Sequence, residues 1–283
     1  STSSTSRKSV ADVLHNEPRL IAYTTDEDLV RADTAASKEQ LYMFFGDNEG
    51  FIHAIDPKTT DSDNLIGGKE KWAFLPKELL SNPGAYQRDA KGSINKRYGM
   101  DGLMNVWAEY GPISTDKSRT ITKAYLYAGM RRGGSNYYSL DVTSIDTPKL
   151  KWVIKGPQQT VQGDGTVVNA TSDYTPGYEK LGRTFSSSKL ADIKINGTKT
   201  KVLIFTGGYD LDQDYIGNNT RKTDDLGNTL YIADAETGKL LWSASNTGAN
   251  LNIASMNHSM PASPTIIDVN RDGLADIIYA ADL

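Results

Sequence analysis

The sequence of 283 residues contains no cysteine and only three histidines. Without cysteine, disulfide bonds, thiolate metal sites and a cysteine nucleophile are excluded. The histidines, His15, His53 and His258, are scattered without the spacing of metal ligands, which argues against a zinc enzyme or a Ser-His-Asp hydrolase. We therefore expect a protein that is not an enzyme.

Long apolar runs and a basic stripe are also missing. No run approaches the ~18 apolar residues of a membrane helix, and the first residues do not resemble a signal peptide, so no transmembrane segment is expected. The net charge is -4 with both signs interspersed, which makes nucleic acid and anionic membranes poor partners. We expect the chain to be a processed or recombinant fragment of a longer protein.

A repeated pattern begins at Gln40, in a chain rich in the glycine, polar and tyrosine residues of short strands and turns. Each of three copies has an apolar strand, a glycine turn, a second apolar strand ending in Asp, another turn and a strand carrying Trp. The Asp and Trp pairs are Asp56 with Trp72, Asp141 with Trp152, and Asp234 with Trp242. This order is the antiparallel meander of a propeller blade. We interpret each Asp as a turn acceptor and each Trp as a filler between adjacent sheets.

The predicted fold is all-β, a modified β-propeller with four-stranded antiparallel blades and long inserted loops. The copies recur at about twice the ~40–50 residues of a compact blade, so loops or degenerate strands lie between them. Further candidate strands run from Leu20 to Tyr23, Gly111 to Ile113, Leu190 to Ile195 and Ser259 to Ile267. Residues 1–40 are expected to form a flexible segment with a possible edge strand. Residues 41–283 are expected to form the propeller domain, truncated at its C-terminal end.

A candidate calcium loop lies near the C-terminal end. Its oxygen donors occupy alternate positions of a nine-residue stretch: Asp268, Asn270, Asp272 and Asp276, with the backbone carbonyl of Leu274. This is the ligand spacing of a calcium loop, and Gly273 supplies the left-handed backbone of its turn. The loop is not an EF-hand, because Tyr279 stands where that motif has a bidentate Glu. The alternative is an Asx-type turn around Asn270 to Gly273 that binds no metal.

The sequence also resembles a known family. The stretch from Asp234 to Trp242 is similar to the repeat of quinoprotein-type propellers. Four further stretches, in this order, resemble the C-terminal domain of the PilY/PilC family of type IV pilus-associated proteins: Gly46 to Asp56, Trp72 to Leu80, Tyr98 to Gly102 and Phe205 to Asp210. The resemblance runs from about Leu41 to the end. It implies a modified β-propeller displayed on pili or the bacterial surface, in the fimbrium or at the outer membrane.

The same resemblance implies a function. Family members take part in pilus biogenesis, favour extension over retraction, and serve twitching motility, adhesion to host cells and virulence. Pilus subunits or minor pilins, and a host-cell receptor, are the implied partners. Calcium regulates these processes through ligands that fall on Asp268, Asn270, Asp272, the Leu274 carbonyl and Asp276. Where the family commonly has Asp, this chain has Asn270, which removes one negative charge and lowers the expected affinity.

Two other functions stay open. The first is a pyrroloquinoline-quinone-dependent dehydrogenase, because the repeat is similar, although such enzymes have a much longer chain and frequently a vicinal disulfide. The second is a non-catalytic outer-membrane assembly scaffold, which would share the fold and lack the calcium loop.

Weaker candidate sites remain. Asp210, Asp212 and Asp214 match the first three ligand positions of a second calcium loop, but Tyr215 stands where the turn needs glycine, so a solvated acidic loop is the alternative. The basic stretch from Met130 to Gly134 is interpreted as a solvated hairpin tip in preference to a site for an acidic partner or a sugar. Aromatic residues outside the repeat positions, Trp107, Tyr137 and Tyr138, are assigned to packing.

Overall fold

The computed structural model describes residues 11–26, 39–58, 68–81, 98–215 and 223–283. It confirms the all-β prediction, with strands throughout and three short 3₁₀ helices in these ranges. Residues 1–10 and 27–38, which belong to the segment predicted to be flexible, lie outside the described residues. No helix in the described ranges is long and apolar enough to cross a membrane.

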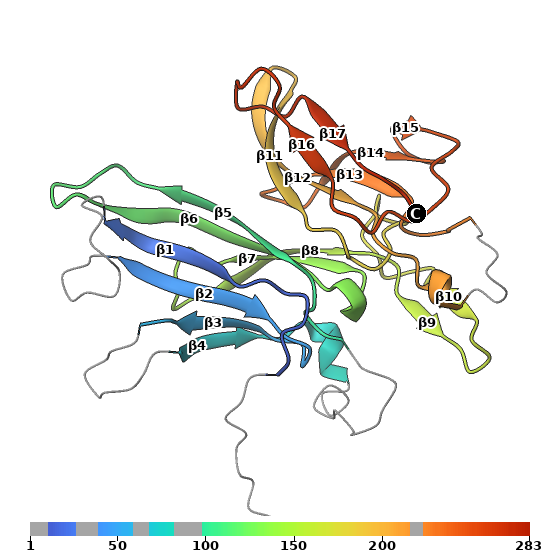
Figure 1. Ribbon diagram of the computed structural model, residues 1–283, viewed down its shortest axis with the longest axis horizontal. Helices are drawn as coiled ribbons and strands as arrows, with labels where there is room; N and C mark the ends of the chain where they lie inside the picture. The colour runs from blue at the N-terminus through green and yellow to red at the C-terminus, as the bar shows by residue number, and fades with distance from the viewer. Residues whose placement is uncertain (1–10, 27–38, 59–67, 82–97, 216–222) are drawn as a thin grey trace, which may run out of the picture.

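Most strands in the described residues belong to three blades of four strands each (Figure 1). The first blade comprises β1 (Arg19–Asp26), β2 (Gln40–Gly46), β3 (Ile52–Asp56) and β4 (Lys69–Phe74). The second comprises β5 (Met104–Tyr110), β6 (Ser118–Gly129), β7 (Asn136–Asp141) and β8 (Lys149–Lys155). The third comprises β11 (Lys189–Ile195), β12 (Thr198–Thr206), β13 (Thr229–Asp234) and β14 (Leu240–Ser245).

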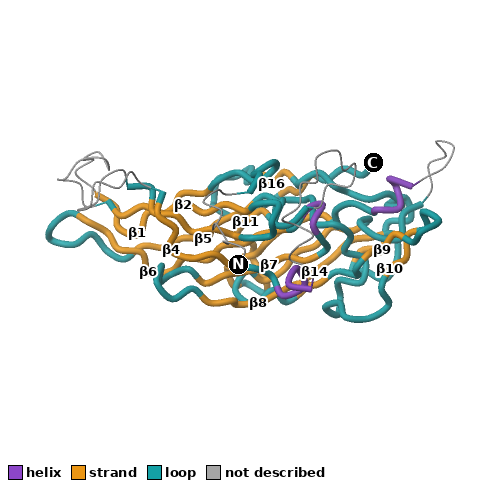
Figure 2. The backbone as a smooth tube through the Cα atoms, turned by 90° about the horizontal axis from the view of Figure 1, so that it is seen from below, coloured by secondary structure: helices purple, strands orange, loops and turns teal. Residues whose placement is uncertain are grey.

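The remaining elements are short. They are β9 (Gln159–Val161), β10 (Val167–Asn169), β15 (Leu251–Asn252), β16 (Thr265–Ile267), β17 (Ile277–Tyr279), η1 (Lys77–Ser81), η2 (Arg131–Gly133) and η3 (Leu211–Tyr215). Strands β16 and β17 form an antiparallel hairpin beside the third blade (Figure 1). Seen from below, the molecule is flat and elongated (Figure 2).

Neighbouring strands within each blade pair in antiparallel order. The first two blades share an eight-stranded sheet, because β1 pairs with β2 on one side and with β6 on the other. The predicted strand near Leu20 is therefore present as β1, and it lies between two partners where an edge position was expected. The predicted strand from Gly111 to Ile113 is wrong, since these residues form a loop and the strand is β5.

The interpretation of the repeated Asp is confirmed. Each Asp ends the third strand of its blade, and its carboxylate accepts a hydrogen bond from a backbone N–H of the turn that follows. The acceptor and donor pairs are Asp56 with Lys58 at 3.0 Å, Asp141 with Thr143 at 3.0 Å, and Asp234 with Thr237 at 2.8 Å. Such Asx turns fix the direction in which the fourth strand leaves the turn.

The interpretation of the repeated Trp is confirmed for the first two blades. The Trp72 indole N–H donates to the carbonyl of Ile145 at 2.8 Å, and that of Trp152 donates to the carbonyl of Ala235 at 3.4 Å. Both acceptors belong to the following blade, in the turn between its third and fourth strands. The Trp residues therefore bridge adjacent blades.

A β-bulge lies immediately before each of these Trp residues. Register shifts between β3 and β4, between β7 and β8, and between β13 and β14 leave one extra residue in each fourth strand. These residues are Lys71, Lys151 and Leu241. A bulge bends its strand and re-aims neighbouring side chains, so the bulge directs Trp72 and Trp152 toward the following blade.

The core consists of two apolar clusters between blades. One lies between the first and second blades and contains Phe44, Ile52, Leu126 and Tyr138 among its buried members. The other lies between the second and third blades and is rich in aromatic rings: Tyr125, Tyr127, Tyr137, Tyr178, Phe205 and Tyr231. Buried tyrosines need acceptors for their hydroxyls. The Tyr127 and Tyr178 hydroxyls each donate to a backbone carbonyl of the third blade, at 3.0 Å.

Candidate functional site

The predicted metal-binding loop connects β16 to β17. Asp268 directly follows β16 and Asp276 directly precedes β17, and the strands pair from Thr265 with Tyr279 to Ile267 with Ile277. The β-branched residues of both strands favour extended backbone. Within the loop, Arg271 and Gly273 have φ angles of 63° and 81°, and this left-handed backbone lets the chain double back.

The Asp268 carboxylate organises the loop from its first position. Its Oδ1 accepts the backbone N–H groups of Arg271 at 2.6 Å and Asp272 at 3.2 Å, and its Oδ2 accepts that of Gly273 at 2.8 Å. Three consecutive amides therefore point at one carboxylate. Such an arrangement holds the turn in place.

The other side chains of the loop also bind its backbone. Asp276 Oδ2 accepts the N–H of Val269 at 2.8 Å, and Asp272 Oδ1 accepts that of Leu274 at 2.8 Å. Asn270 uses both ends of its amide, since Oδ1 accepts the N–H of Asp272 at 2.9 Å and Nδ2 donates to Asp272 Oδ2 at 3.2 Å. The five predicted ligand positions are thus brought into one compact loop.

The donor set of this loop fits a hard cation in part. Carboxylate and amide oxygens are the ligand types that Ca²⁺ prefers, and an oxygen that accepts one hydrogen bond keeps a second lone pair. The carboxylates nevertheless face backbone amides. Among the described residues, no three His, Cys, Asp or Glu side chains form a cluster arranged to hold a metal ion. The Asx-type turn, the alternative that binds no metal, accounts for the hydrogen bonds within this loop.

A positive charge lies close to the loop. A Cβ atom placed on Gly273 would be 3.8 Å from Lys199 Nζ, and Lys199 also pairs with Asp192 at 3.2 Å. The backbone N–H of Ala275 donates to the carbonyl of Asp192 at 2.8 Å. The loop is therefore anchored to β11 of the third blade, beside an ammonium group that opposes cation binding electrostatically.

The acidic residues of the second candidate loop face different partners. Asp210 is 1% exposed and accepts a hydrogen bond from the Gln159 side chain at 2.8 Å. Asp214 accepts one from the Tyr209 hydroxyl at 2.7 Å, while the backbone N–H of Asp212 donates to Asp210 at 3.1 Å. Asp210 thereby ties η3 to the β9–β10 hairpin, which is a structural role. Whether a second ion binds at this loop, which the sequence left open, stays untested.

The basic stretch from Met130 to Gly134 is not a solvated hairpin tip. Arg131 has a φ of 52°, its guanidinium lies 4.5 Å from the centre of the Phe185 ring, and its Nη1 is 3.4 Å from the buried carboxylate of Asp101. The stretch is packed because a fully buried carboxylate needs a charged partner. The assignment of Tyr137 and Tyr138 to packing is confirmed, since each is 2% exposed.

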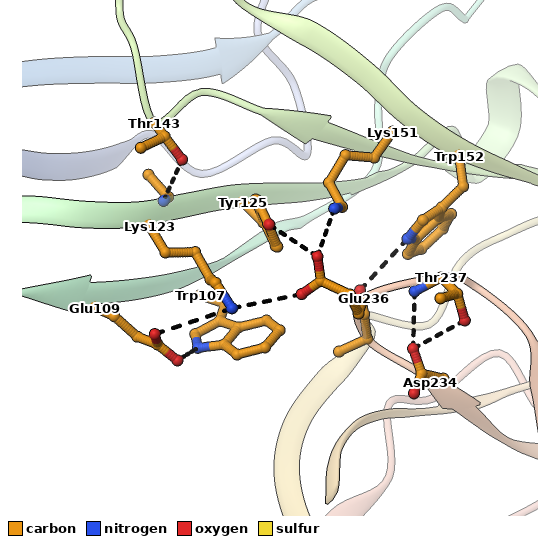
Figure 3. Close-up of polar contacts among 12 residues, drawn as sticks. Trp107, Glu109, Lys123, Tyr125, Thr143, Lys151, Trp152, Asp234, Glu236 and Thr237 are labelled. Carbon is orange, nitrogen blue, oxygen red and sulfur yellow. Dashed lines mark hydrogen bonds and ion pairs between the residues drawn. The ribbon is translucent and has the colours of Figure 1, made fainter.

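A polar junction joins the second and third blades (Figure 3). Glu236, in the turn after β13, reaches across to the second blade. Its carboxylate accepts hydrogen bonds from Lys151 at 2.7 Å, from the Tyr125 hydroxyl at 2.8 Å and from Lys123 at 3.5 Å. Trp107, assigned to packing, is half-buried here with its ring 4.1 Å from Lys123 Nζ.

Charges at this junction shift the pKa values of its members. Burial raises the pKa of the Glu236 carboxyl, but hydrogen bonds from Lys151 and Tyr125 outweigh burial and lower it. For Lys151, burial acts to lower the pKa, but the interactions with Glu236 and Tyr125 together outweigh burial and raise the pKa. Both shifts favour the charged forms. Sequence reasoning missed this junction, although Glu236 lies inside the repeat between Asp234 and Trp242.

Lys71 and Asp146 repeat this arrangement between the first and second blades. Lys71 Nζ is 2.8 Å from Asp146 Oδ1. In both junctions the lysine is the bulge residue before the Trp, and the acid directly follows the residue whose carbonyl accepts the Trp N–H. The pairs therefore form one repeated contact between blades, with the chemistry of a structural clamp.

The family comparison decides what kind of propeller this is. The family model for the PilY1 beta-propeller domain matches residues 21–283. The chain belongs to the PilY1 beta-propeller family. This confirms the resemblance to PilY/PilC proteins and the predicted fold class.

Curated relatives carry the same family name. The type IV pilus biogenesis factor PilY1 homolog of Xylella fastidiosa is 25% identical over 246 residues, covering 86% of this chain and 13% of the relative. The type IV pilus biogenesis factor PilY1 of Pseudomonas aeruginosa strain PAO1 is 24% identical, covering 85% of this chain and 16% of the relative. The chain thus spans less than a fifth of the length of these two relatives.

A solved structure is also similar. The crystal structure of the Pseudomonas aeruginosa PilY1 C-terminal domain has 23% sequence identity and a TM-score of 0.49, covering 86% of this chain and 37% of that chain.

Proposed function

We propose that this chain is a calcium-binding β-propeller module of a type IV pilus-associated surface protein. In this role it supports pilus biogenesis and extension, twitching motility and adhesion to host cells. Membership of the PilY1 beta-propeller family supports the proposal, as does the naming of its curated relatives as type IV pilus biogenesis factors.

The proposed partners follow from that role. They are pilus subunits or minor pilins, with a host-cell receptor as a further partner, and the proposed location is the bacterial surface, in the fimbrium or at the outer membrane. The absence of catalysis and of nucleic-acid binding stays a prediction from the sequence.

The observation that supports a regulatory ion is the shape of the β16–β17 loop. Left-handed backbone at Arg271 and Gly273 already turns four oxygen-bearing side chains inward within nine residues. Asp268, Asn270, Asp272, Asp276 and the Leu274 carbonyl would hold the ion. Bound calcium would supply positive charge between the ends of β16 and β17.

Calcium would stabilise the folded hairpin by mass action. A ligand that binds only the folded state stabilises it by about 2.7 kcal/mol at a hundredfold excess over Kd. Lys199 weakens binding through charge repulsion, and the neutral amide of Asn270 supplies no charge to offset it. We therefore place the affinity in the weak range of extracellular calcium modules, with Kd on the order of 10⁻⁴–10⁻³ M.

The experiment that tests this function uses the full-length protein in its own bacterium. Surface pili and twitching zones are measured for the wild type, for Asp272→Ala and for the matched surface variant Asp164→Asn, with calcium or with a chelator. Asp164 lies in the exposed turn of the β9–β10 hairpin, where its carboxylate accepts the N–H of Thr166.

We expect the chelator and Asp272→Ala to change piliation alike, without additive effect, and Asp164→Asn to behave as wild type. Piliation that responds to the chelator equally in Asp272→Ala and in wild type would exclude this loop as the regulatory element. Normal piliation and motility after deletion of the whole domain would contradict the proposed role in pilus biogenesis and motility.

A further inference from the structure

A cavity of about 270 Å³ lies between strands β13 and β14 of the third blade and two loops. One loop leads from β10 to β11 and the other follows β14. We call it the Lys180 cavity, after the one lysine that lines it. Five of its other lining residues carry a hydroxyl group: Thr229, Tyr231, Ser243, Ser245 and Thr247. The cavity therefore combines one positive charge with many hydrogen-bonding groups.

The register of two strands explains why the hydroxyl groups gather there. Thr229 pairs with Ser245, and Tyr231 pairs with Ser243, across β13 and β14. Alternate residues of a strand point to the same face of a sheet, so these four side chains share a face. That face packs against the second blade, because Tyr231 belongs to the aromatic cluster between the two blades. All four residues are buried, and buried polar groups need hydrogen-bond partners.

Lys180 brings an ammonium group without a counter-ion to the cavity. Its Nζ donates to four neutral oxygens: Ser245 Oγ at 3.1 Å, the side-chain oxygen of Asn246, and the carbonyl and hydroxyl oxygens of Thr247 at 2.8 and 3.1 Å. In the described part of the chain no carboxylate pairs with this ammonium, and burial lowers the pKa of Lys180. An ammonium has three hydrogens, so four acceptors share them and the two contacts at 3.1 Å are the easiest to replace.

The Tyr231 hydroxyl is a second group that lacks a partner. Tyr231 is 1% exposed, and its hydroxyl makes no hydrogen bond of normal geometry with any described residue. Burial raises the pKa of Tyr231 and outweighs the Thr229 side chain and the Lys180 backbone, which lie near the hydroxyl and act to lower it. The hydroxyl therefore keeps its proton and can donate it. Backbone carbonyls accept the hydroxyls of three other buried tyrosines: Tyr127, Tyr137 and Tyr178.

The exposed lining residues form the mouth of the cavity and add one negative charge. Glu179, Thr247 and Gly248 are exposed, and a Cβ atom placed on Gly248 would meet no atom within 4 Å. Glu179 Oε1 accepts the backbone N–H of Gly177 at 2.8 Å, which leaves lone pairs of the carboxylate for hydroxyl donors. The same carboxylate repels any further negative charge at the mouth.

We propose that the Lys180 cavity binds a small monocarboxylate that also carries hydroxyl groups, such as a hydroxy acid or a sugar acid. The carboxylate accepts hydrogen bonds from the Lys180 ammonium and the Tyr231 hydroxyl. The hydroxyl groups of the ligand bind Ser243, Thr247 and the Glu179 carboxylate. Pockets for drug-sized ligands measure about 300–1,000 Å³, so a cavity of about 270 Å³ suits a smaller molecule.

Other occupants satisfy fewer of these groups. Water alone would give Tyr231 a partner and leave the charge of Lys180 without a counter-ion. A neutral sugar would do the same. Phosphate or a dicarboxylate would neutralise Lys180, but its second negative charge would face Glu179 at the mouth. A single carboxylate with hydroxyl groups matches the ammonium, the phenol and the acid at once.

Isothermal titration of the purified protein tests this site with four probes. Glycolate and glucuronate carry one carboxylate with hydroxyl groups, glucose lacks the carboxylate, and inorganic phosphate carries more charge. We expect saturable binding of glycolate or glucuronate with a raised melting temperature, no binding of glucose, and at least about tenfold weaker binding of phosphate. Binding of neither acid at concentrations on the order of 10 mM, or equal binding of phosphate, would overturn the proposal.

Variants then place the binding in the cavity. Tyr231→Phe removes a hydroxyl that has no partner, so we expect the Kd of the bound acid to rise about tenfold or more while the melting temperature without ligand does not fall. Lys180→Met should abolish binding. The matched control is Tyr127→Phe, whose hydroxyl donates to the Ala235 carbonyl outside the cavity; it should lower the melting temperature and leave the Kd unchanged. Wild-type affinity in Tyr231→Phe or in Lys180→Met would overturn the proposal.

Discussion

The Lys151–Glu236 clamp predicts a measurable coupling between the second and third blades. The perturbation is a double-mutant cycle with Lys151→Met, which keeps the aliphatic stem, and Glu236→Gln, which keeps the shape. Lys151 Nζ is 2.7 Å from Glu236 Oε1, and the side chains are 18% and 43% exposed. A cycle isolates their interaction because each single variant removes it without removing the partner's packing.

The magnitude follows from the exposure of the two side chains. Hydrogen bonds to charged groups are worth about 1.5–3 kcal/mol when buried, and exposed ion pairs about 0.2–1 kcal/mol. The Lys151–Glu236 pair lies between these cases, so we expect a coupling free energy of about 1 kcal/mol. The equivalent Lys71–Asp146 pair has side chains 31% and 72% exposed, and we expect about 0.3 kcal/mol from Lys71→Met with Asp146→Asn.

The assay is equilibrium urea denaturation of all single and double variants, at low salt and at about 0.5 M NaCl. High salt should weaken the Lys71–Asp146 coupling more, because screening acts mainly on exposed charges. Equal coupling in the two pairs would refute the reasoning, since it would mean that burial at the blade interface does not set the strength of the clamp.

Two further predictions concern other parts of the first two blades. Burial acts to lower the pKa of His53, but hydrogen bonds to Asp47 at 3.0 Å and Glu70 at 2.6 Å outweigh burial and raise the pKa above 6.5. The difference in unfolding free energy between wild type and His53→Gln should therefore be full below about pH 6.5 and shrink as the pH rises through the raised pKa. Urea denaturation at several pH values checks this, and a difference independent of pH would contradict it. Gly133→Ala should lower the free energy of unfolding by about 2–3 kcal/mol or more, because the new Cβ would lie 1.8 Å from the carbonyl oxygen of Gly99. The control Gly163→Ala, with open space around it, should stay within about 0.5 kcal/mol, and equal losses would refute the steric argument.

The repeat in the sequence was sufficient to predict the second, third and fourth strands of each blade. Glycine turns and the Asp that ends each third strand are local signals, and Asp234 with Thr237 shows how locally they act. The first strands lie outside the repeat, and of these the sequence predicted β1 and β11 but not β5. Strand β5 has no turn signal of its own and a mixed burial pattern. Gly111 and Pro112, which follow it, are residues that commonly bound a strand, and they misplaced the prediction.

The sequence predicted that Trp side chains lie between blades, but it did not predict the lysine–acid pairs beside them. Trp side chains between sheets follow from their size and their periodicity. The acid that each bulge lysine contacts could not be assigned, because Lys151 and Glu236 are 85 residues apart in sequence and only the register of two blades brings them together. The bulge itself is invisible in the sequence, since one extra residue in β8 does not alter its apolar pattern.

The β16–β17 loop shows a different limit of sequence reasoning. Ligand spacing predicted a compact loop with converging oxygens, and Asp268, Asp272 and Asp276 do turn into it. The spacing did not reveal that the same oxygens accept backbone N–H groups, because one pattern of Asp, Asn and Gly encodes both an Asx turn and a calcium loop.

Isothermal titration of the purified protein with calcium tests the central claim most directly. The account predicts saturable binding of one ion to wild type and to Asp164→Asn, a rise in melting temperature at saturation, and loss of both in Asp272→Ala. No binding heat and no change in melting temperature at about 10 mM calcium, a concentration above the weakest expected Kd, would contradict it.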